Sequence, residues 1–262
     1  MITAPQIILL SGFSDSLNEY VSKFTTPVTS ARAVILKTLI DTLKNNGNWY
    51  ILDALNLYAS EAEDHGHVNL INPNYPISSV VDAPVFTIDR GYQMDGVNDA
   101  INSNFILPRY RKNYQLNSAS AFVWSRTSGQ SNNTDLGGIY GADIIIIRCR
   151  TISNLITGRI NDVITDSSTT THTDGTGLKM INRPDSATKN FYNNGSKLGA
   201  DIARASSSII ASQVISPYYG ADQIGSFGVR QIAAAGFGGG HTDAQALSLY
   251  NALATYMTAV GA

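Results

Sequence analysis

The sequence predicts a mainly β protein: an antiparallel two-sheet sandwich preceded by a helical segment and ended by a helix. Three observations lead to this prediction. Residues 85–235 alternate short apolar runs with clusters of Gly, Asn, Asp and Ser, as short strands joined by turns do. The segments before residue 66 and after residue 241 instead carry apolar side chains at helical spacing. With 262 residues, the chain can bury one large core without disulfides.

Residues 1–65 are predicted to form an N-terminal helical docking segment. A first helix begins near Ser30 and ends at Gly47, a typical residue just beyond a helix end. Asn48 then caps a second predicted helix, whose apolar side chains are Ile51, Leu52, Leu55, Tyr58 and Ala59. Both helices need a partner surface, which is the other helix, the sandwich or a neighbouring subunit. Residues 66–84 are predicted to be an extended connector because they contain Pro73, Pro76 and Pro84.

Residues 85–262 are predicted to form the sandwich and its terminal helix. The predicted strands lie at residues 85–88, 91–94, 100–106, 119–125, 143–149, 154–160, 178–182, 189–192, 209–215 and 224–233. The clearest hairpin lies at residues 191–198, because Asn194-Gly195 supplies the positive φ angles of a tight turn.

Two further segments have a clear structural interpretation. The four isoleucines at 144–147 predict a central buried strand, and the chain's single cysteine, Cys149, is predicted to be a buried, inert thiol. Thr242 and Gln245 form a capping box that begins the terminal helix. The apolar stripe of this helix consists of Ala246, Leu249, Tyr250, Leu253, Met257 and Val260.

Residues 94–101, Met-Asp-Gly-Val-Asn-Asp-Ala-Ile, resemble the strand-turn-strand near the start of laminin G-like domains. Asp-Gly forms the turn, and Asn98 and Asp99 close it with side-chain hydrogen bonds. Three later segments match the same family in the same order: Ala-Phe-Val-Trp at 121–124, Phe-Tyr-Asn-Asn-Gly at 191–195 and Ile-Gly-Ser-Phe at 224–227. The chain therefore resembles laminin G-like, concanavalin A-like jelly-roll domains over about residues 85–235.

The helices at both ends resemble those of uncharacterised laminin G-like virion proteins of tailed bacteriophages. This resemblance implies a fibre, spike or capsid-decorating component, located in the virion and made in the host cytoplasm. Its partners would be other virion proteins and further copies of the same chain, as a homo-oligomer. No basic N-terminal region precedes the short apolar run at residues 7–10, so a signal peptide is not expected.

The composition fits such a surface role. Charged residues make up 15% of the chain, below the usual level of about 25%. The net charge is −2 and the pI about 6.0, so no overall field attracts nucleic acid or an anionic membrane, and neither is expected as a partner.

Catalytic residues are not expected. Concanavalin-like glycosidases need two carboxylates across a cleft, usually two glutamates on one strand. The three glutamates of this chain, Glu19, Glu61 and Glu63, all precede the predicted sandwich. Its aspartates stand in turn contexts such as Asp95-Gly96, where they are typical turn formers.

No cofactor or metal is expected either. His65-Gly66-His67 offers two imidazoles, but the spacing is not that of a closed zinc site, and a solvated polar segment is the favoured interpretation. His241, after three glycines, is interpreted as part of a flexible loop. Calcium at Asp95, Asn98 and Asp99 remains the alternative to a structural turn.

The candidate ligand-binding residues are aromatic and basic. Residues 108–114, Pro-Arg-Tyr-Arg-Lys-Asn-Tyr, form the one basic cluster, in which Tyr110, Arg111 and Tyr114 can stack on and pair with an acidic glycan or line an assembly contact. Tyr218 and Tyr219 form a second aromatic pair, which can stack on a sugar or lie at a subunit interface.

The sequence thus favours a non-enzymatic virion structural protein. The main alternative is a lectin-like module that binds a host surface polysaccharide, and the third is a polysaccharide-degrading enzyme.

Overall fold

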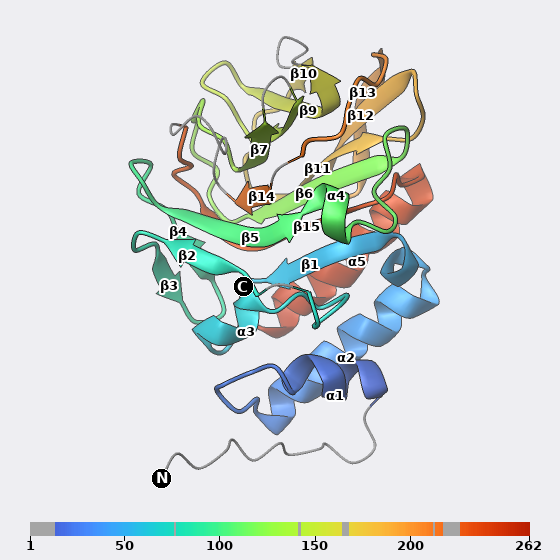
Figure 1. The fold of residues 1–262 in the computed structure, drawn as a ribbon. Helices are drawn as coiled ribbons and strands as arrows, with labels where there is room; N and C mark the ends of the chain where they lie inside the picture. Colours follow the sequence, from blue (N-terminus) through green and yellow to red (C-terminus); the bar gives the residue numbers. More distant parts are fainter. Residues whose placement is uncertain (1–13, 76, 141–142, 164–167, 212, 217–225) are drawn as a thin grey trace.

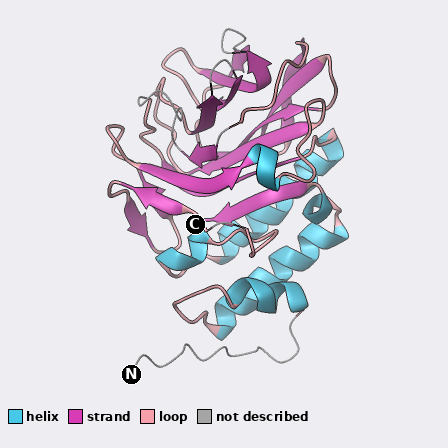
Figure 2. Ribbon diagram, viewed as in Figure 1, coloured by secondary structure: helices cyan, strands magenta, loops and turns pink. Residues whose placement is uncertain are grey.

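Two antiparallel sheets pack face to face, and helices cover the outer face of one of them (Figure 1; Figure 2). The computed structural model describes residues 14–75, 77–140, 143–163, 168–211, 213–216 and 226–262. The predicted fold class, a mainly β sandwich with helices at both ends, is confirmed.

The first sheet lies against the helices. Its strand order is β13-β12-β11-β6-β15-β4-β3, and β1 also pairs with β15. The strands are β1 (Leu52–Leu57), β3 (Val85–Thr87), β4 (Gly91–Gln93), β6 (Ala119–Ser125), β11 (Gly177–Arg183), β12 (Thr188–Asn193), β13 (Ser196–Ala203) and β15 (Gln231–Gly238).

The second sheet closes the sandwich from the opposite side. Its strand order is β10-β9-β8-β7-β14-β5-β2. The strands are β2 (Ser79–Val81), β5 (Ala100–Ile106), β7 (Leu136–Tyr140), β8 (Asp143–Arg148), β9 (Leu155–Val163), β10 (Ser168–Thr171) and β14 (Gln213–Ser216). The isoleucine run forms β8, which lies between β7 and β9 with all four isoleucines buried, as predicted.

The described residues also form two longer and four short helical segments. They are α1 (Asp15–Val21), α2 (Ser30–Asn45), the 3-10 turn η1 (Asn48–Tyr50), α3 (Glu63–His67), α4 (Leu107–Tyr110) and α5 (Asp243–Ala259). The predicted start of α2 and the capping box of α5 are both confirmed. No helix in the described part of the chain is both long and apolar enough to span a membrane.

The apolar core has two layers. One cluster lies between the two sheets and includes Phe105, Ile145 and Phe191. The other lies between the first sheet and the helices and joins residues such as Leu39 of α2 and Leu253 of α5. The helices therefore complete the core of the sandwich.

The second predicted helix is wrong, because residues 52–57 form strand β1. β1 pairs with β15 of the first sheet, and all six of its residues are buried. A bulge between Leu52 and Ala54 places Leu52, Leu55 and Leu57 on the helix-facing side and Ala54 toward the sandwich interior. The bulge creates a three-residue spacing that imitates a helix.

Three other predictions need correction. The connector at residues 66–84 is not wholly extended, because it includes the end of α3 and strand β2. The strand predicted at 224–233 begins only at Gln231, and Ser226 and Phe227 lie outside any strand. In the segment 209–215, residues 209–211 lie outside any strand and β14 includes Gln213.

The Asn-Gly hairpin forms as predicted. The Asp-Gly turn also forms, but the side chains of Asp95 and Asp99 close it and that of Asn98 does not. Asn194 and Gly195 have φ of 50° and 75° between β12 and β13. At the second turn, Asp95 Oδ1 accepts hydrogen bonds from the backbone N–H groups of Val97, Asn98 and Asp99, at 2.8, 3.2 and 3.3 Å. These bonds hold the pKa of Asp95 below its usual value, as expected of a structural turn.

A buried ionic cluster lies inside the sandwich. Asp162 of β9 pairs with both Arg183 of β11 and Lys189 of β12, and all three side chains are fully buried. The Asp162 carboxylate therefore pairs with two cations. Burial lowers the pKa of Lys189, although the pairing with Asp162 acts in the opposite direction.

Candidate functional site

The residues predicted to bind a ligand at 108–114 do not form one exposed surface. Tyr114 is fully buried, and its hydroxyl donates a 2.6 Å hydrogen bond to Asn161, so its predicted role in stacking on a glycan is wrong. Tyr110 is half-buried against Tyr75, with ring centroids 5.8 Å apart. Arg111 donates 2.9 Å hydrogen bonds to the Tyr114 carbonyl and to a neighbouring glutamine. Tyr218 and Tyr219 lie outside the described residues.

A cavity lies instead beside the β12–β13 hairpin. It has a volume of about 420 Å³ and is open to solvent. We call it the hairpin pocket; its lining consists of Pro184, Asp185, Thr188, Asn190, Tyr192, Lys197, Asp201, Gly240, His241, Thr242 and Asp243. Its volume lies within the range of about 300–1,000 Å³ that is typical of small-molecule sites.

Strand alternation explains how β12 builds one wall of this pocket. Thr188, Asn190 and Tyr192 occupy alternate positions and therefore share one face of the strand. The intervening Lys189 and Phe191 point into the sandwich, where Lys189 joins the ionic cluster and Phe191 the apolar core. The same short strand thus supports the core and presents polar groups to the pocket.

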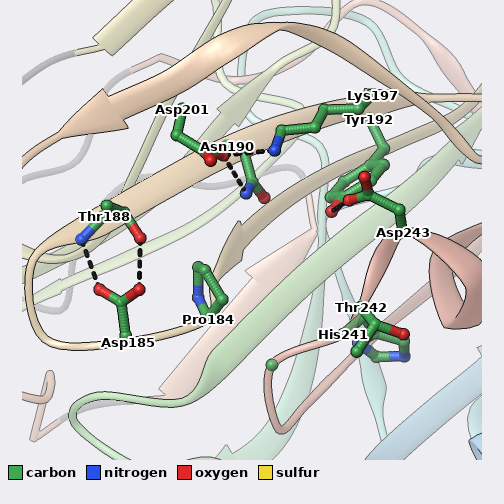
Figure 3. A pocket seen from close by; sticks show the side chains of 11 residues that line it. Pro184, Asp185, Thr188, Asn190, Tyr192, Lys197, Asp201, His241, Thr242 and Asp243 are labelled. Atoms are coloured by element: carbon green, nitrogen blue, oxygen red, sulfur yellow. Dashed lines mark hydrogen bonds and ion pairs between the residues drawn. The ribbon is translucent and has the colours of Figure 1, made fainter.

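Three hydrogen-bonded side chains, Lys197, Asp201 and Asn190, lie on the β12–β13 side of the pocket. Asp201 Oδ1 accepts hydrogen bonds from Lys197 Nζ at 2.5 Å and from Asn190 Nδ2 at 2.9 Å (Figure 3). The pKa of Asp201 lies below its usual value, first because of the Lys197 bond and then because of the Asn190 bond. The pKa of Lys197 is raised by the same pair, so both groups are ionised at neutral pH.

Two further carboxylates belong to the loops around the pocket. Asp185 accepts hydrogen bonds from the backbone N–H and hydroxyl of Thr188 at 2.8 and 2.7 Å, which lower its pKa (Figure 3). Asp243, in the first turn of α5, accepts a 2.6 Å bond from the Tyr192 hydroxyl. Burial and this bond raise the pKa of Tyr192, so its hydroxyl remains a donor.

His241 anchors the loop that leads into α5. The residue is only 2% exposed, so its prediction as part of a flexible loop is wrong. Asn182 fixes the loop by accepting a 2.7 Å hydrogen bond from the His241 N–H and donating a 2.9 Å bond to the His241 carbonyl. The same Asn182 amide donates to Asn190 at 3.1 Å, which joins the loop to the hairpin wall.

The pocket holds several hydrogen-bond donors and acceptors in fixed positions. Its lining contains three aspartates and one lysine, and burial lowers the pKa of His241 to about 4 and leaves it neutral. Carboxylate acceptors fixed beside amide, hydroxyl and ammonium donors match the alternating hydroxyls of a sugar. The excess of carboxylates disfavours an anionic ligand.

The other histidines have structural partners. His65 is 2% exposed and stacks on Phe24 with ring centroids 4.0 Å apart, so its interpretation as solvated is wrong. His67 Nε2 shares a 2.7 Å hydrogen bond with the Tyr92 hydroxyl. The part of the chain that the structure describes contains no group of three or more His, Cys, Asp or Glu suited to a metal ion.

Sequence reasoning found the frame of the hairpin pocket but not the pocket. The Asn-Gly turn and the capping Thr242 were both identifiable, and the alternating Thr188, Asn190 and Tyr192 were a signal for a polar strand face. The proximity of this face to the start of α5, more than fifty residues later, follows only from the tertiary structure.

Comparison with known proteins identifies the fold. No family model and no curated protein matches the sequence. Among solved structures, the chain is similar to the binding domain of botulinum neurotoxin serotype D, with 15% identity and a TM-score of 0.51, covering 77% of this chain and 52% of that one. The serotype G binding domain is similar at 16% identity and a TM-score of 0.51, over 76% of this chain and 50% of that one.

A second group of similar structures consists of sialidases. A Trypanosoma rangeli sialidase in complex with sialic acid matches with 10% identity and a TM-score of 0.53, over 83% of this chain and 38% of that one. The chain therefore spans about half or less of the proteins it resembles. At these identities the likeness concerns the fold: the chain has the antiparallel β-sandwich found in these proteins.

Proposed function

We propose that this chain is a lectin-like module that binds a neutral carbohydrate in the hairpin pocket. The observation that carries the proposal is the lining of the pocket, where Asp201, Lys197 and Asn190 form a fixed set of donors and acceptors at the edge of a rigid sheet. The similarity of the fold to the binding domains of botulinum neurotoxin serotypes D and G also supports the proposal.

The pocket favours recognition over catalysis. Each of its three carboxylates accepts a hydrogen bond from a neighbouring side chain, and none of the chain's glutamates lines it. Glycoside hydrolysis needs one carboxyl group that stays protonated near neutral pH. The pKa values of Asp185 and Asp201 are shifted in the opposite direction, below their usual values.

A glycan array followed by calorimetry with the best neutral glycan tests the proposal. Asp201→Asn removes the charge that orders Lys197 and Asn190, and we expect the affinity to fall about tenfold or more, as for the loss of a charged hydrogen bond. Asp41→Asn is the matched control, because Lys37 and Asp41 form a similar exposed pair on α2, away from the pocket.

Two results would overturn the proposal: no array signal for the wild type, or equal affinity in the two variants. Release of reducing ends from a bound polysaccharide would instead show that the module is an enzyme. If the array signal is lost in a Tyr218→Ala/Tyr219→Ala variant but kept in Asp201→Asn, the glycan binds at Tyr218 and Tyr219 and not in the hairpin pocket. Display on a virus particle stays a prediction, and antibody labelling of purified particles would check it.

A further inference from the structure

A second site, distinct from the hairpin pocket, lies where four segments of the chain meet. It is a groove of about 140 Å³, which we call the aromatic groove; its lining consists of Trp49, Tyr50, Leu52, Asp53, Ile71, Asn72, Tyr75, Lys112 and Asn113. The groove thus combines the η1 turn, the start of β1, the segment after residue 70 and the basic loop that precedes β6.

Exposed aromatic surface is the first argument that this groove binds a ligand. The Tyr50 side chain is 67% exposed and makes no hydrogen bond or ring contact with the described residues. Tyr75 is half-buried and held edge-on by Phe105, with ring centroids 5.1 Å apart. A free ring beside a fixed ring offers a flat apolar face, which suits the C–H face of a pyranose.

The polar wall of the groove is rigid. Asp53, which is 2% exposed, accepts 2.8 Å hydrogen bonds from the backbone N–H groups of Asn113 and Tyr114. The Asn113 side chain also donates a 3.1 Å bond to the Leu52 carbonyl. The backbone of the basic loop is therefore clamped to β1 next to Lys112, whose exposed side chain lines the groove.

Charge distinguishes the ligand of this groove from that of the hairpin pocket. The loop carries Arg109, Arg111 and Lys112 and no acidic residue. The Arg109 guanidinium lies 5.1 Å from the centre of the Tyr110 ring, and Arg111 binds the loop itself, which leaves Lys112 as the cation that lines the groove. The one carboxylate of the groove, Asp53, is occupied by its backbone bonds.

We propose that the aromatic groove is a second sugar site, which stacks a pyranose on Tyr50 and pairs the carboxylate of an acidic sugar with Lys112. This inference rests on the proposed carbohydrate-binding function, but it uses none of the hairpin-pocket residues. The module would therefore take neutral sugars at one site and uronic acids at the other.

Calorimetry with trigalacturonic acid, and with its neutral analogue galactotriose, tests this inference on the full chain. We expect trigalacturonic acid to bind wild type more tightly than galactotriose does, and the difference to shrink as salt is added. Tyr50→Ala should lower the affinity for trigalacturonic acid at least about fivefold, and Lys112→Gln should lower it about tenfold. Both side chains are exposed, so the variants should keep the wild-type circular dichroism spectrum and melting temperature.

The control variants truncate a side chain or neutralise a lysine at positions outside the groove. Val97→Ala removes a side chain of similar exposure, 70%, and Lys37→Gln removes an exposed lysine of α2. Unchanged trigalacturonic acid affinity in both Tyr50→Ala and Lys112→Gln would overturn the inference, as would no binding to wild type. Failure of the proposed hairpin-pocket function would give a different result. In that case Asp201→Asn would leave the affinity for the neutral glycan unchanged, while Tyr50→Ala and Lys112→Gln would still weaken the binding of trigalacturonic acid.

Discussion

Acidification should destabilise this protein through His241. The side chain is buried, and its Nε2 has no hydrogen-bond partner among the described residues, while Nδ1 lies 3.1 Å from the Gly239 carbonyl. Protonation would place a charge in this buried position with an N–H that lacks an acceptor. Burial is therefore the main reason that the pKa of His241 falls from 6.5 to about 4.

The magnitude follows from this difference in pKa. Between pH 6.5 and pH 4 the unfolded chain binds a proton at His241 that the folded chain does not, so the free energy of unfolding falls as the pH falls. The stabilisation is complete above pH 6.5 and is lost progressively between pH 6.5 and about pH 4. The loss is on the order of 3 kcal/mol, and most of it is reached by about pH 4.5.

Urea unfolding from about pH 7.5 to about pH 4.5, on wild type and His241→Phe, measures this effect. The variant keeps an aromatic ring but cannot bind the proton, so its free energy of unfolding should fall by about 2–3 kcal/mol less than that of wild type. Other groups titrate in both proteins and cancel in the comparison. Parallel pH profiles would refute the reasoning, because they would mean that His241 is protonated as easily in the folded protein as in the unfolded one.

Three further predictions concern the sandwich itself. Asp162→Asn removes the carboxylate that pairs with the buried Arg183 and Lys189, and it should lower the free energy of unfolding by about 3–5 kcal/mol. Lys189→Met should change it by less than about 1 kcal/mol, and similar urea midpoints for the two variants would contradict this. Gly195→Ala forces an alanine to φ of 75° and should cost about 1–3 kcal/mol, measurable by thermal melting, with an unchanged melting temperature as the contrary outcome. The Cys149 thiol, fully buried and with its pKa raised by burial, should react with a thiol reagent only after denaturant is added; rapid labelling of the native protein would argue against this burial.

The sequence determined the local structure wherever short-range rules are strong. The spacing of apolar side chains and the residues around Gly47 predicted α2, and the capping box at Thr242 predicted the start of α5. Asn194-Gly195 predicted its hairpin because few other pairs adopt two positive φ angles. These features depend on neighbouring residues alone.

The sequence was misleading where a strand is buried on both sides. β1 carries apolar residues on both faces and a bulge near Asp53, so its pattern cannot be distinguished from a helix by periodicity. Tyr114 was misread for a related reason: aromatic residues beside arginines are typical of binding loops, yet this ring contributes to the core between the sheets.

Both proposed sites were decided by the tertiary structure. The hairpin pocket needs the polar face of β12 to meet the start of α5, and the aromatic groove needs Tyr50 and Tyr75 to meet Lys112. Such contacts join residues far apart in the chain, and they arise because the buried faces of the strands and helices must pack on each other. The sequence by itself therefore determined the fold class and its local turns, while packing decided which polar and aromatic side chains share a surface.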